Sequence, residues 1–319
     1  MELGFTHNLG EPICPQKRDL TIKYKRNKAV TLIELLVSLA VITLLVAIMI
    51  PVLSKGRRNA RAVRTMNNQR QIVVAVTSFA SDNNGRYPES VATIGVREQH
   101  WNWQEPTMLT SYRRRSPRMH RSMSAYLRSY IADASIMFCP NAPKKYKYLQ
   151  KAWDAGDDWD NPETPTVQDP LMGTYCFYWN YIGFLDERKA AFRGPWGLSG
   201  GHGSCKILVS DYFGYGHWRN KLVYNNHKAF GSCEKFKYAS VTPGTWVSSD
   251  FWSRPADNGN VGLDTLELEL HAGYMDGHVE RYGPSEVVPM KVSKTSDGSV
   301  PYPSELGPGV FYLPRNALY

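Results

Sequence analysis

The sequence predicts an α+β protein in which one long N-terminal helix packs on an antiparallel β-sheet with long inserted loops. Two observations carry this prediction. The apolar run from Val30 to Ile50 contains neither Gly nor Pro, and helix-spaced apolar residues continue beyond it to Phe79. Near the other end of the chain, apolar and polar residues alternate on both sides of Asp276-Gly277, the pattern of a β-hairpin.

The apolar run is long enough to cross a lipid bilayer. At about 1.5 Å of rise per residue, residues 30–50 would form a helix of roughly 30 Å, which matches the hydrocarbon core. Its one ionisable side chain is Glu34, and a carboxylate inside a bilayer costs about 2.5–3.5 kcal/mol on insertion scales. The simplest compensating partner is a new α-amine, created if the chain is cut immediately before Val30.

Two ordinary membrane signals explain this run less well. A secretory signal peptide has an apolar core of about 7–15 residues that ends in a small-x-small cleavage site. Here the small-x-small element Ser38-Leu39-Ala40 lies in the middle of the run. A plain membrane anchor gives no reason for Glu34.

The start of the run resembles the N-terminus of type IV pilins and type II secretion pseudopilins. The resemblance rests on Lys28-Ala29-Val30-Thr31-Leu32-Ile33-Glu34-Leu35-Leu36-Val37 and on Pro51 directly after the run. It implies that a prepilin peptidase cleaves between Ala29 and Val30 and methylates the new amine. It also implies that Glu34 pairs with the terminal amine of a neighbouring subunit during assembly. The family usually has Gly before the cut and Phe after it, where this chain has Ala29 and Val30.

The resemblance also implies an organisation in four segments. Residues 1–29 form a cytoplasmic leader, 30–50 the transmembrane segment, 51–82 the amphipathic half of the helix, and 83–319 a globular α+β head. The chain would span the inner membrane once, with its head in the periplasm or outside the cell, before it joins a filament. The implied partners are prepilin peptidase, other pilin or pseudopilin subunits and inner-membrane lipid.

The sequence also marks the end of the long helix and several elements of the head. Gly85 can cap the helix and Pro88 cannot continue it, and this Asn-Gly-x-Tyr-Pro ending also resembles pseudopilins. We expect a short helix at 122–132, loop over 141–172, and strands at 173–181 and 206–211. In the hairpin over 266–282, Asp-Gly favours a type I′ turn.

The hairpin itself carries a further resemblance. Its ending, Tyr-Met-Asp-Gly-His-Val, resembles the C-terminal strand pair of large pilin-like proteins with an aspartate-glycine-histidine signature. Many of those proteins place a histidine ten residues before the aspartate, and here that position is Leu266. We interpret Asp276 as a turn residue rather than a ligand.

The chain is basic, with a formal net charge of +9. One basic cluster follows the membrane segment, at Lys55, Arg57, Arg58, Arg61 and Arg64. We interpret it as a solvated helix face that touches lipid headgroups, rather than as a nucleic-acid site. Because basic residues flank the membrane segment on both sides, charge alone does not set its orientation, and the family resemblance does.

Five cysteines occur, and removal of the leader with Cys14 leaves four in an oxidising compartment. Of the three possible pairings we favour Cys139–Cys176 and Cys205–Cys233, because each encloses a short segment broken by Gly or Pro. Buried thiols are the alternative. No spacing resembles CxxC, which argues against a zinc site.

Few residues suggest a cofactor or catalysis. Asp154, Asp157, Asp158 and Asp160 crowd one loop with the hard oxygen ligands that calcium prefers, but their spacing matches no EF-hand, and a solvated acidic loop explains them as well. Five of the eight histidines could form a metal or acid–base group, but they are scattered and no carboxylate lies at a diagnostic spacing from them; they are His202, His217, His227, His271 and His278. We therefore predict no enzyme and, calcium apart, no cofactor.

Three functional hypotheses follow. The first is a structural filament subunit of a pilus or a type II secretion-like pseudopilus, in a minor position because the head is large. The second is a type IV minor pilin for adhesion or DNA uptake, suggested by the arginines between 113 and 128. The third is a membrane-anchored glycan- or protein-binding module exported with a pilin-type leader, for which the 9 Trp and 19 Tyr residues would supply a surface.

Overall fold

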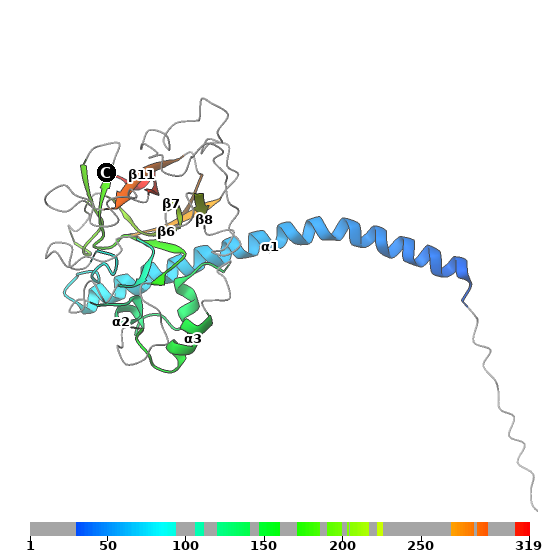
Figure 1. Ribbon diagram of the computed structural model, residues 1–319, viewed down its shortest axis with the longest axis horizontal. Coiled ribbons are helices and arrows are strands. Elements are labelled where there is room, and N and C mark those ends of the chain that lie inside the picture. Colours follow the sequence, from blue (N-terminus) through cyan, green and yellow to red (C-terminus); the bar gives the residue numbers. More distant parts are fainter. Residues whose placement is uncertain are drawn as a thin grey trace, which may run out of the picture. The chain divides into compact units, whose positions relative to one another are not determined.

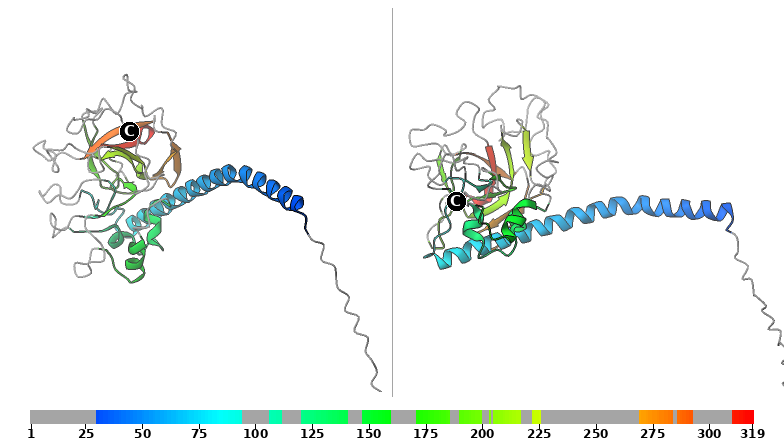
Figure 2. Two further views of the ribbon diagram at one scale, coloured as in Figure 1. Left: turned by 45° about the vertical axis from the view of Figure 1, so that its right-hand side comes forward. Right: turned by 60° about the horizontal axis from the view of Figure 1, so that its bottom comes forward.

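The computed structural model describes twelve stretches of the 319-residue chain. They are 30–93, 106–111, 120–140, 147–159, 171–185, 190–199, 203, 205–216, 222–225, 269–283, 286–292 and 310–319. The chain divides into two compact units, Met1–Lys55 and Gly56–Tyr319. Figures 1 and 2 show the elements of both units.

Helix α1 (Leu32–Asp82) is the longest element and continues through Pro51, as the sequence predicts. It is the one helix among the described residues that is long and apolar enough to cross a membrane. The part of α1 in the first unit is exposed throughout. In the second unit, one side of α1 is buried from Thr65 onward, which makes this half amphipathic.

The C-terminus of α1 has the geometry of a Schellman cap. The Gly85 N–H donates to the Ala80 carbonyl at 2.7 Å. Asn84, the residue before Gly85, has a left-handed backbone with φ 55°. Gly85 follows with φ 73°. The helix therefore ends where the sequence predicts, but an asparagine rather than the glycine provides the first left-handed residue.

A four-stranded antiparallel sheet packs against this half of α1. Its order is β10–β9–β6–β3, and its strands are β10 (Val279–Tyr282), β9 (Leu270–Tyr274), β6 (Ile207–Asp211) and β3 (Tyr175–Phe177). The register pairs Val209 with Gly273 on β9 and with Phe177 on β3. The predicted α+β arrangement of a long helix on an antiparallel sheet is confirmed.

Gly273 sets how closely α1 approaches this sheet. A Cβ atom built on Gly273 would lie 2.8 Å from Val73 Cγ2 and 3.0 Å from Val209 Cγ1. Real Cβ atoms do not approach other carbons so closely. The glycine therefore leaves room for the side chains of Val73 on α1 and Val209 on β6.

A second, six-stranded antiparallel sheet was not predicted. Its order is β5–β4–β11–β12–β7–β8, with strands β5 (Ala190–Arg193), β4 (Ile182–Leu185), β11 (Val287–Val292), β12 (Val310–Pro314), β7 (Phe213–Gly216) and β8 (Leu222–Asn225). A two-stranded sheet joins β1 (Met108–Thr110) to β2 (Leu171–Met172). Strands β4 and β11 lie far apart in sequence, so no local pattern reveals their pairing.

The short helices lie beside the C-terminal half of α1, away from β7, β8 and β11 (Figures 1 and 2). They are α2 (Met123–Leu127), the 3₁₀ helix η2 (Ala134–Met137) and α3 (Lys147–Asp154); a further 3₁₀ helix, η6 (Arg315–Ala317), lies near the C-terminus. The expectation of loop over 141–172 was wrong at α3. Leu149, Ala152 and Trp153 recur at helical spacing and are buried together, which stabilises a helix in a polar stretch.

Aromatic residues dominate the described core. The largest fully buried side chains are Trp179, Tyr175, Tyr178, Tyr181, Tyr212, Tyr312, Phe192 and Phe213. Rings also pack on one another, as Phe213 and Tyr312 do with centroids 4.8 Å apart. In the described part of the chain, aromatic residues thus serve mainly to fill the interior of the head.

The β9–β10 hairpin is confirmed, but its predicted turn type was wrong. Gly277 N–H donates to the Tyr274 carbonyl and Tyr274 N–H to the His278 carbonyl, each at 3.0 Å, which leaves a three-residue loop. Only Gly277 is left-handed in this loop, with φ 92°, whereas a type I′ turn needs positive φ at Asp276 as well. The turn is therefore a type I turn followed by a left-handed glycine.

Gly273→Ala should destabilise the head by about 1–3 kcal/mol, because the added methyl overpacks the contact between α1 and β9. Urea unfolding of a head fragment that begins at Lys55 measures this cost. In a Val73→Ala background, which removes the closest carbon, the cost of Gly273→Ala should fall. Equal costs in the two backgrounds would show that the helix does not press on this glycine.

Candidate functional site

The N-terminus of α1 is closed by a capping box between Thr31 and Glu34. The Thr31 N–H and hydroxyl both donate to Glu34 Oε2, at 2.8 and 2.9 Å, and the Glu34 N–H donates to Thr31 Oγ1 at 3.3 Å. Each side chain satisfies a backbone group that the first helical turn leaves open. The Thr-x-x-Glu spacing signals this box in the sequence, but our sequence analysis assigned no capping role to Thr31.

The capping box holds the Glu34 carboxylate beside Val30 without neutralising it. All the donors that it meets are uncharged groups of Thr31. Among the described residues no cation pairs with this carboxylate. A single chain therefore presents a positioned negative charge at the start of an apolar helix.

The rest of this segment offers an uninterrupted apolar surface. The large apolar side chains from Val30 to Leu53 are each about half exposed or more. The hydroxyls of Ser38 and Thr43 donate to the carbonyls of Leu35 and Ala40, both at 2.9 Å, so they add no unsatisfied polar group. Such a surface suits lipid or another apolar helix.

Comparison with known protein families adds a direct match at this site. Residues 24–50 match the family model described as the Prokaryotic N-terminal methylation motif. This chain carries the prepilin-type cleavage and methylation motif of pilins and pseudopilins. The matched motif is that of type IV pilin-like proteins, and it supports a pilus or pseudopilus subunit in general. The motif implies processing by prepilin peptidase, membrane anchoring before assembly, and assembly with pilin subunits.

Pilin-like proteins are typically structural rather than enzymatic. No curated protein and no solved structure matches the chain. The role of the head must therefore be argued from its own residues, and its most unusual feature is a charged network under α1.

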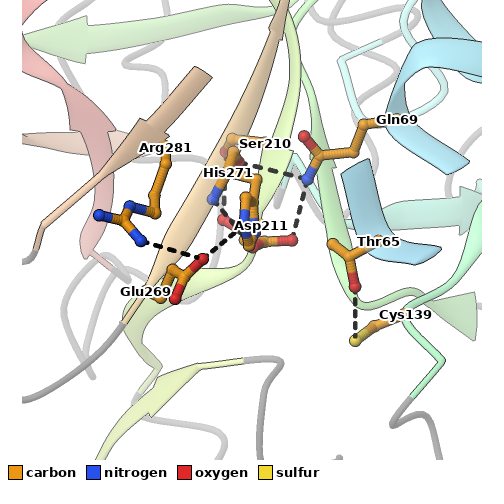
Figure 3. A network of polar contacts seen from close by, with 8 residues as sticks. All are labelled: Thr65, Gln69, Cys139, Ser210, Asp211, Glu269, His271 and Arg281. Carbon is orange, nitrogen blue, oxygen red and sulfur yellow. Dashed lines mark hydrogen bonds and ion pairs between the residues drawn. The ribbon is translucent and has the colours of Figure 1, made fainter. Parts of the chain in front are cut away.

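This network joins α1 to the sheet through a buried carboxylate (Figure 3). Asp211, at the end of β6, accepts hydrogen bonds from the backbone N–H of His271 at 2.9 Å and from Gln69 Nε2 of α1 at 2.9 Å. His271 Nδ1 lies 2.9 Å from the same carboxylate, and Gln69 also donates to the His271 carbonyl at 3.2 Å. All three residues are fully buried.

From this centre, charges alternate outward to the surface. His271 Nε2 lies 3.4 Å from Glu269 Oε1, and Arg281 lies 3.6 Å from the same oxygen. Burial alone would lower the pKa of His271, but the hydrogen bond and charge of Asp211, with a smaller contribution from Glu269, raise this pKa above its ordinary value. The raised pKa favours the charged form of this ring, which lies between two carboxylates, one buried and one half-exposed.

The geometry fits a structural clamp better than a catalytic centre. An Asp–His pair orients a base in many enzymes, but a base must reach a substrate. Here both members are fully buried between α1 and the sheet. Charge held in this position favours one register of the helix on the strands, because any shift would leave the carboxylate without its donors.

In the sequence, His271 is one of several scattered histidines, and no local pattern indicates its pairing with Asp211. Asp211 and His271 are far apart in the chain and meet only because β6 and β9 are neighbours. The signal that could have found them is an aspartate at the end of a strand that begins with three apolar residues. His202, His217 and His227 lie outside the described residues.

His278 belongs to the hairpin turn. Its backbone N–H donates to Asp276 Oδ1 at 3.2 Å, its ring nitrogen contacts the same oxygen, and its ring stacks on Tyr274 with centroids 4.3 Å apart. Burial alone would raise the pKa of Asp276, but these hydrogen bonds from His278 lower it. In the described structure the aspartate-glycine-histidine sequence thus stabilises its own turn; Leu266 lies outside the described residues.

The favoured Cys139–Cys176 disulfide is not formed; Cys139, Cys176 and Cys205 are buried thiols. Cys139 contacts Thr65 of α1 at 3.8 Å. Cys176 instead follows Tyr175, which pairs with Asp211 on the helix side of the sheet, so its side chain points to the opposite face. Burial raises the pKa of the Cys205 thiol to about 12, and Cys233 lies outside the described residues.

The described aspartates of the predicted calcium loop do not converge on a metal site. Asp154 accepts from Gln150 at 2.8 Å, Asp157 caps the backbone N–H of Trp159 at 2.8 Å, and Asp158 pairs with Arg128 at 3.4 Å. No group of three or more potential metal ligands occurs among the described residues. Asp160 lies outside them.

The head should lose stability as pH rises through the raised pKa of His271. Because the pKa of His271 is raised, its contribution to the free energy of unfolding is complete below about pH 6.5 and is lost as pH rises through the folded pKa. Asp211, Glu269 and Arg281 are the charged groups around it, and Gln69 faces it from α1.

Urea unfolding of the head fragment between pH 5.5 and 9 tests this expectation. His271→Gln should remove the decline, and Asp211→Asn should cost about 3–5 kcal/mol near neutrality by leaving the imidazolium without its buried partner. His278→Gln, at a half-exposed turn, is the matched control and should keep the decline. An unchanged pH profile in His271→Gln would contradict the charged clamp.

Proposed function

We propose that this chain is a minor subunit of a pilus or type II secretion-like pseudopilus filament. It is anchored in the inner membrane by residues 30–50, cut between Ala29 and Val30 by prepilin peptidase, methylated on Val30 and polymerised through the apolar half of α1. One observation carries the proposal: Glu34 is the only charged side chain on an exposed apolar surface that runs from Val30 to Leu53.

The energetics of Glu34 explain why assembly would be favourable. In the bilayer its carboxylate costs about 2.5–3.5 kcal/mol, and the donors of Thr31 satisfy its hydrogen bonds without cancelling its charge. The ammonium of Val30 on a neighbouring subunit would supply the missing positive charge. Each subunit then both donates an ammonium and accepts one, which propagates a filament.

A minor or tip position suits the head. The second unit extends from Gly56 to Tyr319 and contains three sheets besides the buried half of α1. A major subunit repeats along the whole filament and must pack laterally at every step. A bulky head is accommodated more easily where few copies are present or where the filament ends.

The mature chain should begin at Val30 and carry one added methyl group on its amine. Mass spectrometry of the N-terminal peptide from membranes measures this. Ala29→Gly, which restores the residue usual in the family, should raise the processed fraction, and Ala29→Leu should block processing because the site takes a small residue. Residues 1–29 found intact in assembled protein would contradict the proposal.

Glu34→Leu should leave membrane insertion and cleavage intact but prevent assembly. The neighbour's Val30 ammonium would enter the apolar bundle unpaired, and breaking one side of a buried ion pair costs about 3–5 kcal/mol. Glu34→Asp should be intermediate, since it keeps the charge and loses reach. Crosslinking in cells and filament purification measure incorporation.

Thr43→Leu is the matched control for this substitution. It also replaces a polar residue of the apolar helix, but the Thr43 hydroxyl is satisfied within the helix, so assembly should continue. Normal incorporation of Glu34→Leu would mean that the glutamate is no assembly contact. The membrane-anchored binding module would then become the better hypothesis.

A further inference from the structure

Three arginines form a stripe on α1 just after the apolar segment. Arg57, Arg61 and Arg64 recur at helical spacing, so they share one face, and all three are exposed. We call them the arginine stripe. Between Glu34 and Asp82, α1 contains no acidic residue, and within the described part of the chain no carboxylate pairs with any of the three.

The stripe continues into the face of α1 that packs on the head. One turn after Arg64, Asn68 is buried and donates to the carbonyls of Ser135 and Phe138 at 3.4 and 3.3 Å. Ile72, one turn further, is also fully buried. The arginines therefore lie on the same face of α1 that is buried further along the helix, but they precede the buried part and remain exposed.

The stripe lies within reach of a membrane surface. Leu53 is the last of the exposed apolar residues of the segment, and Arg57 follows four residues later, at most about 14 Å away even in an extended chain. Headgroups add about 5–7 Å beyond the hydrocarbon on each side, and charges act over a Debye length of about 8 Å at physiological salt.

Arg70 provides an internal comparison. It is exposed on the same helix but lies about 20 Å beyond Arg57 along the axis, because it follows thirteen residues later. It is therefore outside the reach of the surface that Arg57 and Arg61 touch.

We propose that the arginine stripe binds the phosphate groups of anionic lipids in the leaflet on the head side of the membrane. This inference rests on the proposed function only through membrane anchoring; it does not require assembly. Guanidinium groups bind phosphate through paired hydrogen bonds, and arginines that pair with no described carboxylate complement an anionic surface.

Two further arguments favour lipid over another partner. Basic residues that follow a membrane segment oppose transfer of that side across the bilayer, so a stripe on the head side needs a use that offsets this effect. A neighbouring subunit would have to bring its carboxylates beneath the head to reach this face. Lipid phosphates already lie at that level.

The test uses the purified full chain in micelles of a neutral detergent. Fluorescent phosphatidylglycerol is titrated into the micelles, and phosphatidylcholine with the same fluorophore and acyl chains controls for the headgroup. The chain should retain the anionic lipid preferentially, and the preference should fall as sodium chloride rises from 50 to 500 mM. Equal retention of the two lipids would overturn the proposal.

Matched variants locate the contact. Arg57→Gln and Arg61→Gln should each lower the preference about fivefold, the effect of removing one arginine near an anionic surface, while Arg70→Gln should leave it unchanged. Equal effects of all three variants, or none, would overturn the proposal. Displacement of the lipid by millimolar inorganic phosphate would also overturn it, because it would indicate a site for free anions.

A protein partner gives a different result. Loss of crosslinking between neighbouring subunits in cells carrying Arg57→Gln and Arg61→Gln, with unchanged lipid preference in micelles, would overturn the lipid assignment in favour of an acidic neighbour. Failure of the proposed function is detected by a separate experiment, the incorporation of the Glu34→Leu variant into filaments. The lipid preference does not depend on that outcome, because it is measured on chains that have not assembled.

Discussion

The head depends on one contact, that between the buried side of α1 and the four-stranded sheet. At Gly273 the strand has no side chain, so the helix comes within van der Waals distance of the strand backbone. Beside that glycine, Gln69 binds both Asp211 and the backbone of β9. The first feature sets the distance between helix and sheet, and the second sets the register. Apolar packing alone would fix neither so narrowly, since apolar contacts are not directional.

Burying a charged group costs desolvation free energy, and the groups around Asp211 offset this cost. Asp211 accepts from Gln69 and from the backbone N–H of His271, and its carboxylate raises the pKa of the His271 ring beside it, which favours the charged form. Glu269 and Arg281 then carry the alternation of charge outward to solvent. Each charge therefore has an opposite neighbour on the path from the core to the surface. Removing a single member is costly because it leaves the adjacent charge without compensation.

Much of the fold could be predicted because its signals are local. The helical period, the Asn-Gly ending and the alternation around Asp276-Gly277 are each read within a short window, and α1 and the β9–β10 hairpin follow from them. The six-stranded sheet pairs β4 with β11, two short strands that are distant in sequence. No short stretch of sequence therefore indicates that they pair. Helix α3 was missed because its apolar residues lie within a polar, proline-flanked stretch.

The site divides in the same way. The processing motif and Glu34 are adjacent in the sequence and could be predicted from it. The capping of the helix by Thr31 was not predicted. The clamp was missed because Asp211 and His271 become neighbours only when β6 and β9 pair. The prediction of a Cys139–Cys176 disulfide was wrong for a related reason. The number of residues between two cysteines limits the distance between them, but it does not show on which face of a strand each side chain lies.

One helix thus meets three environments in succession, and its composition changes with each. Up to Leu53 its side chains are apolar apart from a capped glutamate and two internally bonded hydroxyls. At Arg57, Arg61 and Arg64 its side chains are basic and exposed. From Thr65 it presents small, amide and β-branched residues to the interior of the head. A filament subunit needs this order, because the apolar part must leave lipid for other helices without disturbing the folded head. The clamp on Gln69 lies further along the helix than the exposed arginines, in the part of α1 that is bonded to the sheet.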